Sequence, residues 1–185
     1  MNKNSISCLQ NNTPEVFDST LFDFANNATA ISVFNYHNSL PNYESTPLVK
    51  LSKLASSLGI NEILIKDESQ RFDLNAFKVL GASYAIAKYL AELLELKDDD
   101  LTFSNIIENK SKYEHITFVT ATDGNHGRAV AWTAKLFGCK AVVYMPLGSS
   151  PRRLEAIKNY GASASITSMN YDDTVIYANQ KAQEE

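Results

Sequence analysis

The chain has 185 residues, of which 44% are hydrophobic and 10% aromatic, so it can bury a core in one globular domain with additional segments. Its 17 basic and 21 acidic residues give a net charge of −4 and form no basic stripe, which argues against a nucleic-acid partner. Cys8 and Cys139 are far apart and form no CxxC motif, so we expect free thiols and no metal site.

The sequence also lacks the signals of a membrane or exported protein. Residues 1–10 contain no long apolar run after a basic start, and no window approaches the ~18 apolar residues of a membrane span. We therefore expect no membrane partner and a cytoplasmic location.

The first quarter of the chain is rich in Asn, Ser and Thr and has no sustained hydrophobic period. We interpret residues 1–45 as an arm that lies over another part of the protein. Apolar residues at near-helical spacing predict a short helix over residues 49–58, which Gly59 ends. The apolar run at residues 63–65 predicts a buried strand.

A long helix is predicted over residues 78–96, where an apolar stripe recurs at helical spacing. Near its start, Gly81, Ala82 and Ser83 are small enough to permit close approach of another backbone. The charged run at residues 97–100 predicts a solvated surface loop.

Strands and helices then alternate to the end of the chain. Strands are predicted at residues 116–121, 141–145 and 164–167, with helices at 125–137 and 151–160 and a last one capped by Asp172 or Asp173. Apolar strands separated by helices predict an α/β fold in which a parallel sheet is covered on both faces, a three-layer αβα arrangement.

Lys78 is the first candidate for chemistry, because it stands at the start of the long helix beside Phe77, Val79 and Leu80. Partial desolvation disfavours the charged form of an amine, and an uncharged lysine can hold an aldehyde cofactor covalently. The structural alternative is a lysine whose aliphatic part packs on the helix while its amine reaches water.

The second candidate is a loop that follows a strand and precedes a helix, where ligands collect in open parallel sheets. It reads Thr122-Asp123-Gly124-Asn125-His126-Gly127. The free N–H groups of a helix start favour an anion such as a carboxylate or phosphate. Asp123 would repel that anion unless it acts as a base or is held by a partner, and it could instead cap the helix.

Two further features of this region have open interpretations. His126 could titrate near neutral pH or pack against the helix and bond a backbone group. Ser149, Ser150, Arg152 and Arg153 form a polar, basic helix start, which either meets a phosphate or is simply solvated.

Several separate runs in the same order resemble one enzyme group. They are Lys66-Asp67-Glu68-Ser69, Ala76-Phe77-Lys78-Val79-Leu80-Gly81, Thr120-Ala121-Thr122-Asp123-Gly124-Asn125-His126-Gly127-Arg128, Val143-Tyr144-Met145-Pro146 and Met169-Asn170-Tyr171-Asp172-Asp173. The chain resembles the fold-type II pyridoxal-phosphate enzymes, the tryptophan-synthase-β and threonine-dehydratase group, and within it the diaminopropionate ammonia-lyase family. That group usually has Ser or Thr where this chain has Asp123. Asp73 and Ala82 stand where glycine is expected, and Leu147 where lysine is expected.

The resemblance implies a function and a set of site residues. The reaction would be the α,β-elimination of 2,3-diaminopropionate to pyruvate and ammonia with pyridoxal 5'-phosphate as cofactor, in a homodimer. Lys78 would hold the cofactor and remove the α-proton of the L-isomer, and Asp123 would remove that of the D-isomer. Cofactor-binding residues would be Phe77, Lys78 and Asn125; substrate-binding residues would be Thr122, Asp123, Gly124, Asn125 and His126.

The resemblance also implies a domain organisation. Residues 1–45 would be the arm, 46–77 part of the large cofactor domain and 78–185 the small αβα domain. The chain ends inside a predicted helix, before the glycine-rich phosphate cradle of the family, so we expect an N-terminal portion that is inactive alone. It would be a truncated reading frame, an excised domain or a piece of a split enzyme with a companion chain.

Two other functions remain open at this point. One is a serine or threonine dehydratase, which a serine at position 123 would have favoured. The other is a non-catalytic remnant or interaction module that keeps the fold and binds no cofactor.

Overall fold

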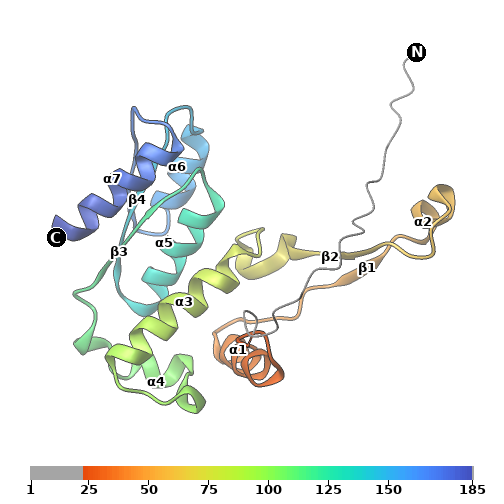
Figure 1. Cartoon of the computed structure of the whole chain (residues 1–185), viewed down its shortest axis with the longest axis horizontal. Helices are drawn as coiled ribbons and strands as arrows, with labels where there is room; N and C mark the ends of the chain where they lie inside the picture. Colours follow the sequence, from red (N-terminus) through yellow and green to blue (C-terminus); the bar gives the residue numbers. More distant parts are fainter. Residues whose placement is uncertain (1–22, 185) are drawn as a thin grey trace.

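The structure is a computed structural model that describes residues 23–184. Its larger part is a parallel sheet with helices on both faces, and a two-stranded antiparallel ribbon extends away from it (Figure 1). The described residues of the arm lie beside the larger part. The chain is thus an α/β fold, as the sequence predicts.

The sheet consists of β3 (Thr117–Ala121), β4 (Lys140–Met145) and β5 (Ser163–Ile166) in the order β3-β4-β5. Both pairings are parallel, with Val119 opposite Val142 and Val143 opposite Ala164. Since parallel strands end at the same edge, the loops that follow β3 and β4 are neighbours. The loop formed by residues 122–127 lies at this edge of the sheet.

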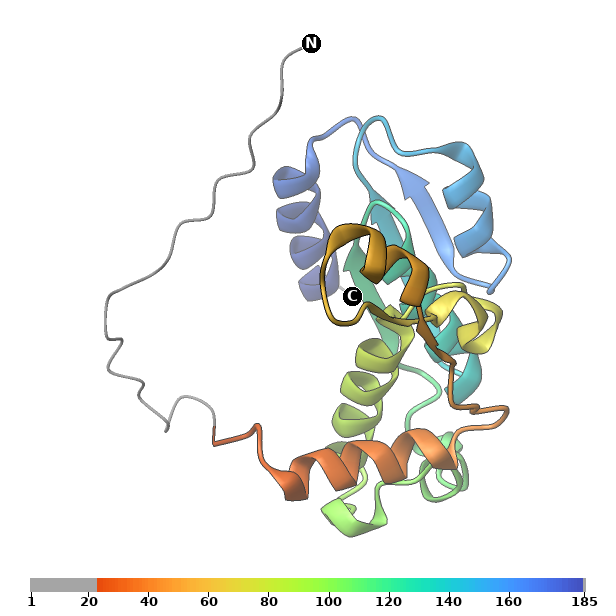
Figure 2. The ribbon, with the colours of Figure 1, turned by 90° about the vertical axis from the view of Figure 1, so that its right-hand side faces the viewer.

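Helices cover both faces of the sheet, which confirms the predicted three layers (Figure 2). On one face, α5 (Asn125–Phe137) and α6 (Pro151–Lys158) bury Ala131 and Ile157 against Val143. On the other face lies α7 (Tyr171–Glu184), whose Tyr177 ring meets that of Tyr144 at 4.9 Å. Successive side chains of a strand point to opposite faces, so Val143 and Tyr144 serve different layers.

The helix ends agree with the sequence in part. Gly138 ends α5 with a φ of 78°, a conformation that glycine adopts without steric cost. Pro151 begins α6 as predicted, but Ser150 makes no side-chain cap bond and the helix ends at Lys158 rather than residue 160. The prediction that Asp172 or Asp173 caps the last helix is wrong, because the Asn170 side chain accepts the Asp173 N–H at 2.9 Å.

Helix α3 (Lys78–Leu93) packs against α5 and also against α1 (Asn27–Ser39). The first half of the predicted arm lies outside the described residues, and the second half contains α1, a helix that the sequence does not predict. Tyr36 is fully buried and its hydroxyl donates to the Ser83 carbonyl at 2.8 Å, while the His37 ring nitrogen lies 2.9 Å from the Leu80 carbonyl oxygen. The helix is held by these contacts with α3 rather than by an apolar stripe of its own.

The connection from α3 to β3 contains one short helix and two 3-10 turns. They are Asp98–Asp100, α4 (Phe103–Ile107) and Lys110–Lys112. The charged run at residues 97–100 is exposed, as expected, and Cys139, which directly precedes β4, is a free thiol. Cys8 lies outside the described residues.

The ribbon corrects two predictions. The stretch at residues 49–58 begins as a strand, β1 (Leu48–Lys50), and only its second part is a helix, α2 (Ser52–Leu58). A strand, β2 (Leu64–Lys66), forms at the predicted place, but it is not buried, since Leu64 is 50% and Ile65 46% exposed. Within residues 23–184 the ribbon has two strands, and no helix covers it.

A buried arginine joins the ribbon to the end of the arm. Arg71, in the 3-10 helix Glu68–Asp73, is 4% exposed and donates to Glu68 at 2.8 Å and to the Glu44 carbonyl at 2.7 Å. Hydrogen bonding to Arg71 holds the pKa of the Glu68 carboxyl below its usual value. The ion pair therefore persists at neutral pH and anchors the segment that leads to Lys78.

In the described part of the chain, no helix combines the length and the apolar content needed to cross a lipid bilayer. Across the same residues, His, Cys, Asp and Glu form no group of three or more that could hold a metal ion.

Candidate functional site

A cleft of about 510 Å³ lies between the first turns of α3 and the loop that follows β3. It is lined by Phe77, Lys78, Leu80, Gly81, Ala82, Thr122, Asp123, His126 and Tyr171. The structure thus brings together two segments that are at least forty positions apart in the sequence. Five predicted site residues share this cleft: Phe77, Lys78, Thr122, Asp123 and His126.

Lys78 is the first residue of α3 and is exposed. The sequence suggests that its apolar neighbours shield it, but the structure shows Val79 buried in the core and Phe77 63% exposed. Consecutive helical residues point in directions about 100° apart, so Val79 cannot cover the amine of Lys78. The amine therefore faces an open cleft with an apolar wall on one side.

Gly81 follows Lys78 by one helical turn and keeps the cleft open. A Cβ atom added at Gly81 would meet nothing within 4 Å, and residues three apart lie on the same face of a helix. The small residues near the start of α3 thus face two different parts of the protein. Gly81 lines the cleft, whereas the carbonyl of Ser83 accepts a hydrogen bond from Tyr36 of α1.

The loop after β3 presents the start of α5 without a side-chain cap. Thr122 is buried and its hydroxyl accepts the Gly124 N–H at 3.1 Å, while Gly124 is the residue that precedes the helix. The possibility that Asp123 caps α5 is therefore not realised. The first N–H groups of a helix have no partner within it, so this helix start can receive an anion.

Asp123 faces an arginine of α6. One guanidinium nitrogen of Arg153 lies 3.7 Å from the Asp123 carboxylate and donates to the Asp123 carbonyl at 3.2 Å. Both side chains are more than half exposed, so the ion pair contributes only about 0–1 kcal/mol to stability. The arginine offsets part of the charge of Asp123. Asp123 therefore has the charged partner that can hold a carboxylate beside an anion site.

His126 is half-buried on the first turn of α5. Burial lowers its pKa below the usual value, and the nearby positive charge of Lys78 lowers the pKa further. The imidazole is therefore neutral near pH 7 and can act as a hydrogen-bonding group without adding a charge to the cleft.

Gly124 and Asn125 line a second hollow of about 290 Å³ on the other side of the loop, together with Arg128, Ser150, Arg152, Arg153 and Ala156. The start of α5 thus separates two cavities. The polar helix start noted in the sequence adjoins the predicted site through Ser150, Arg152 and Arg153.

Two residues near the site belong to runs that carry the family resemblance, but the sequence does not single out either of them as a site residue. Tyr171, the first residue of α7, is 52% exposed. It lines the cleft because α7 packs against β3, the strand that leads into the loop. Arg128 reaches from α5 to the turn before Lys78. Only the tertiary fold brings either side chain to this place.

Gly127 is required by the packing beneath the loop. A Cβ atom there would collide with the Thr122 methyl group and come within 2.7 Å of a Val143 methyl group. We expect Gly127→Ala to lower the free energy of unfolding by about 1–3 kcal/mol because of overpacking. Urea unfolding of the full chain would measure this change.

Gly81→Ala is the matched control, since Gly81 is also helical but has open space around it. We expect this change to be neutral or to stabilise α3 by about 0.5–1 kcal/mol. Equal effects of the two substitutions would contradict the assignment of Gly127 as a packing-constrained position.

The sequence profile of the family described as "Pyridoxal-phosphate dependent enzyme" matches residues 40–185. The chain is 54% identical over 153 residues to a diaminopropionate ammonia-lyase of Salmonella typhimurium, covering 82% of this chain and 38% of that protein. It is also 30% identical over 144 residues to a catabolic L-threonine dehydratase of Staphylococcus aureus, covering 78% of this chain and 36% of that protein.

The fold matches solved structures of the same kind. The crystal structure of diaminopropionate ammonia lyase from Escherichia coli in complex with D-serine superposes with a TM-score of 0.80 at 47% identity, covering 85% of this chain and 40% of that one. The chain therefore spans well under half the length of the relatives that it matches. The matched profile extends over most of the chain and includes both segments that line the cleft, so the chain belongs to the family of pyridoxal-phosphate dependent enzymes.

Proposed function

We propose that this chain supplies the lysine and the substrate-binding loop of an enzyme that converts 2,3-diaminopropionate to pyruvate and ammonia with pyridoxal phosphate. The observation that carries the proposal is that Lys78 and Asp123 line one cleft from separate elements, α3 and the loop before α5. An amine and a carboxylate on one cleft are two possible proton acceptors.

The cleft has the features that this cofactor needs from the chain. Lys78 has an exposed amine, Gly81 leaves space beside it, and the uncapped start of α5 can accept negative charge. Lys78 would hold the cofactor covalently and Phe77 would contact it in the cleft. Asn125, which lines the second hollow across the start of α5, would donate a hydrogen bond to the ring oxygen of the cofactor. When bound, the cofactor supplies an electron sink for a carbanion at the substrate α-carbon.

The residues of the chain would act on the two isomers in different ways. Lys78 would take the α-proton of the L-isomer at Nζ, and Asp123 would take that of the D-isomer at a carboxylate oxygen. Thr122, Gly124, Asn125 and His126 would hold the substrate carboxylate at the start of α5. The pairing of Asp123 with Arg153 offsets part of the negative charge that this carboxylate meets, and His126, whose pKa is lowered by burial, adds no charge of its own.

The higher similarity to a diaminopropionate ammonia-lyase than to a threonine dehydratase supports 2,3-diaminopropionate as the substrate. Identity is 54% to the diaminopropionate ammonia-lyase and 30% to the threonine dehydratase. The Escherichia coli relative binds D-serine in its crystal structure, so a D-amino acid can occupy an enzyme with this fold.

We extend the proposal to organisation and location. Residues 1–45 would form the arm, 46–77 part of the large domain and 78–185 the small domain of a homodimer. The position of the β1–β2 ribbon, away from the parallel sheet, is in keeping with this division (Figure 1). The free thiol of Cys139 is compatible with the reducing cytoplasm.

The test is a hybrid enzyme, in which this chain is followed by the part of the Salmonella typhimurium relative that lies beyond its matched segment. We expect the hybrid to bind pyridoxal phosphate, to be labelled at Lys78 after borohydride reduction, and to release ammonia from 2,3-diaminopropionate faster than from serine or threonine. The matched control is the intact Salmonella enzyme under the same conditions.

Two results would contradict the proposal. A folded hybrid that prefers serine or threonine would favour a dehydratase. A folded hybrid that cannot be labelled at Lys78 would favour a non-catalytic module of this fold.

A further inference from the structure

The turn before Lys78 has an unusual backbone. Phe72, Asp73 and Asn75 have φ values of 48°, 57° and 54°, in the left-handed region that side chains disfavour. Between them, Leu74 is 3% exposed and anchors the turn in the core. Asp73 stands where the family resemblance leads us to expect glycine, the residue that adopts such a φ most easily. A turn of this kind persists only when neighbouring groups hold it.

Arg128 holds this turn from α5. Its two terminal guanidinium nitrogens donate to the carbonyl oxygens of Asp73 and Leu74, each at 3.1 Å. Its guanidinium carbon also lies 5.7 Å from the centre of the Tyr160 ring. The planar fork of arginine can reach two successive carbonyls at once, which a lysine amine on a flexible stem does less well.

The backbone of Arg128 lies in the first turn of α5, next to the loop at residues 122–127. Its N–H donates to the Gly124 carbonyl at 3.0 Å, within the first turn of α5. The same residue therefore contacts the loop that carries Asp123 through its main chain and the turn before Lys78 through its side chain.

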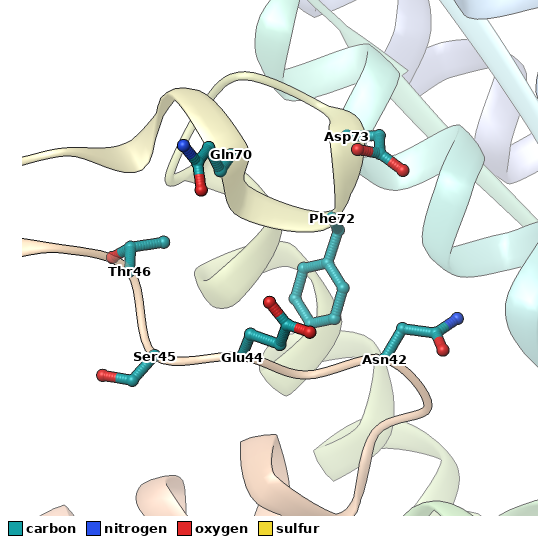
Figure 3. A pocket seen from close by; sticks show the side chains of 7 residues that line it. All are labelled: Asn42, Glu44, Ser45, Thr46, Gln70, Phe72 and Asp73. Carbon is teal, nitrogen blue, oxygen red and sulfur yellow. The ribbon is translucent and has the colours of Figure 1, made fainter.

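One helical turn beyond Arg128, Trp132 supports the same turn, because its ring lies 4.9 Å from that of Phe72. The Phe72 ring also borders the end of the arm, where it points toward Asn42 and Glu44 across a pocket of about 180 Å³ (Figure 3). The arm holds the start of this segment through the hydrogen bond from Arg71 to the Glu44 carbonyl. The hydrogen bonds to the carbonyls of Asp73 and Leu74 come from α5.

We propose that Arg128 is a positioning residue that holds the turn at residues 72–75 and thereby sets the place of Lys78 relative to the loop at residues 122–127. The structural part of this proposal stands without a cofactor. Its consequence for catalysis rests on the proposed function. Misplacement of a reacting group by about 1 Å is enough to lower a rate on the order of 100-fold.

Hydrogen–deuterium exchange of the full chain tests the structural part. In Arg128→Gln, the amides of residues 74–80 are expected to exchange about 10-fold faster, while those of residues 129–137 in α5 keep their rates. Arg128→Lys should give an intermediate change. The matched control is Lys135→Gln, which removes a positive charge from the same helix but no contact with the turn; it should leave both segments unchanged.

Unchanged exchange at residues 74–80 in Arg128→Gln would overturn the proposal. An equal increase in both segments would overturn it too, because Arg128 would then only stabilise the chain as a whole.

In the hybrid enzyme, Arg128→Gln should lower kcat for both isomers by about 10-fold to 100-fold with little change in KM, and Arg128→Lys should restore part of the loss. A wild-type kcat in Arg128→Gln would refute the catalytic consequence. If the exchange result is as expected but the unsubstituted hybrid eliminates no ammonia, the proposed function fails and the structural role of Arg128 stands.

Discussion

Replacing Lys78 with alanine is expected to abolish the formation of pyruvate from both isomers of 2,3-diaminopropionate in the hybrid enzyme. The loss should be at least about 10³-fold, because the same amine is proposed to hold the cofactor and to take a proton. Borohydride reduction should no longer attach the cofactor to the peptide that contains position 78. Pyruvate release and mass spectrometry of that peptide measure the two effects.

The substitution should not disturb the fold, since the Lys78 side chain is exposed. Lys88→Ala is the matched control, because Lys88 lies on the same helix and pairs with Asp98 at 2.6 Å on the surface. It should keep full activity and full labelling at Lys78. Labelling that persists in Lys78→Ala at another lysine, with turnover retained, would refute the assignment.

Replacing Asp123 with asparagine is expected to separate the two isomers. Turnover of the D-isomer should fall about 10²-fold to 10⁴-fold, the usual contribution of a general base, while turnover of the L-isomer is largely kept. Asparagine has nearly the same shape, and the hydrogen bond from Arg153 to the main-chain carbonyl of residue 123 can remain. Initial rates with each pure isomer measure the ratio.

The control for this experiment is Asp99→Asn, which removes one carboxylate from an exposed 3-10 turn remote in sequence from the cleft. Both isomers should then react at the rate of the unsubstituted hybrid. Equal losses on the D- and L-isomers in Asp123→Asn would contradict the two-base assignment and would point to a shared role of Asp123 in holding the loop.

The location of Lys78 at the start of a helix and of Asp123 in a strand-to-helix loop follows from local patterns. That both line one cleft follows from the packing of α3 against α5, which involves residues far apart in the sequence. The openness of the cleft at Lys78 could not be predicted from its apolar neighbours, because Val79 turns into the core. Likewise, the sequence could not predict that Asp123 pairs with Arg153 of α6. Asp123 does not cap α5, the helix that follows it directly.

The sequence by itself determined the parallel-sheet portion of this protein. The helix at residues 125–137 has the bounds of α5, because Gly138 ends it and an apolar stripe marks its buried face. Such signals are local. In an alternating strand–helix pattern they also predict the packing, because each helix packs against the strands next to it in the sequence.

Tertiary structure alone decided the remaining features. Helix α1 buries Tyr36 against α3, β1 pairs with β2, and the left-handed turn before Lys78 receives two hydrogen bonds from Arg128. In each case the partner is more than ten positions away in the sequence. A local hydrophobic pattern therefore cannot predict the contact. The physical reason is that these segments gain their favourable free energy from long-range contacts, which outweigh weak local preferences.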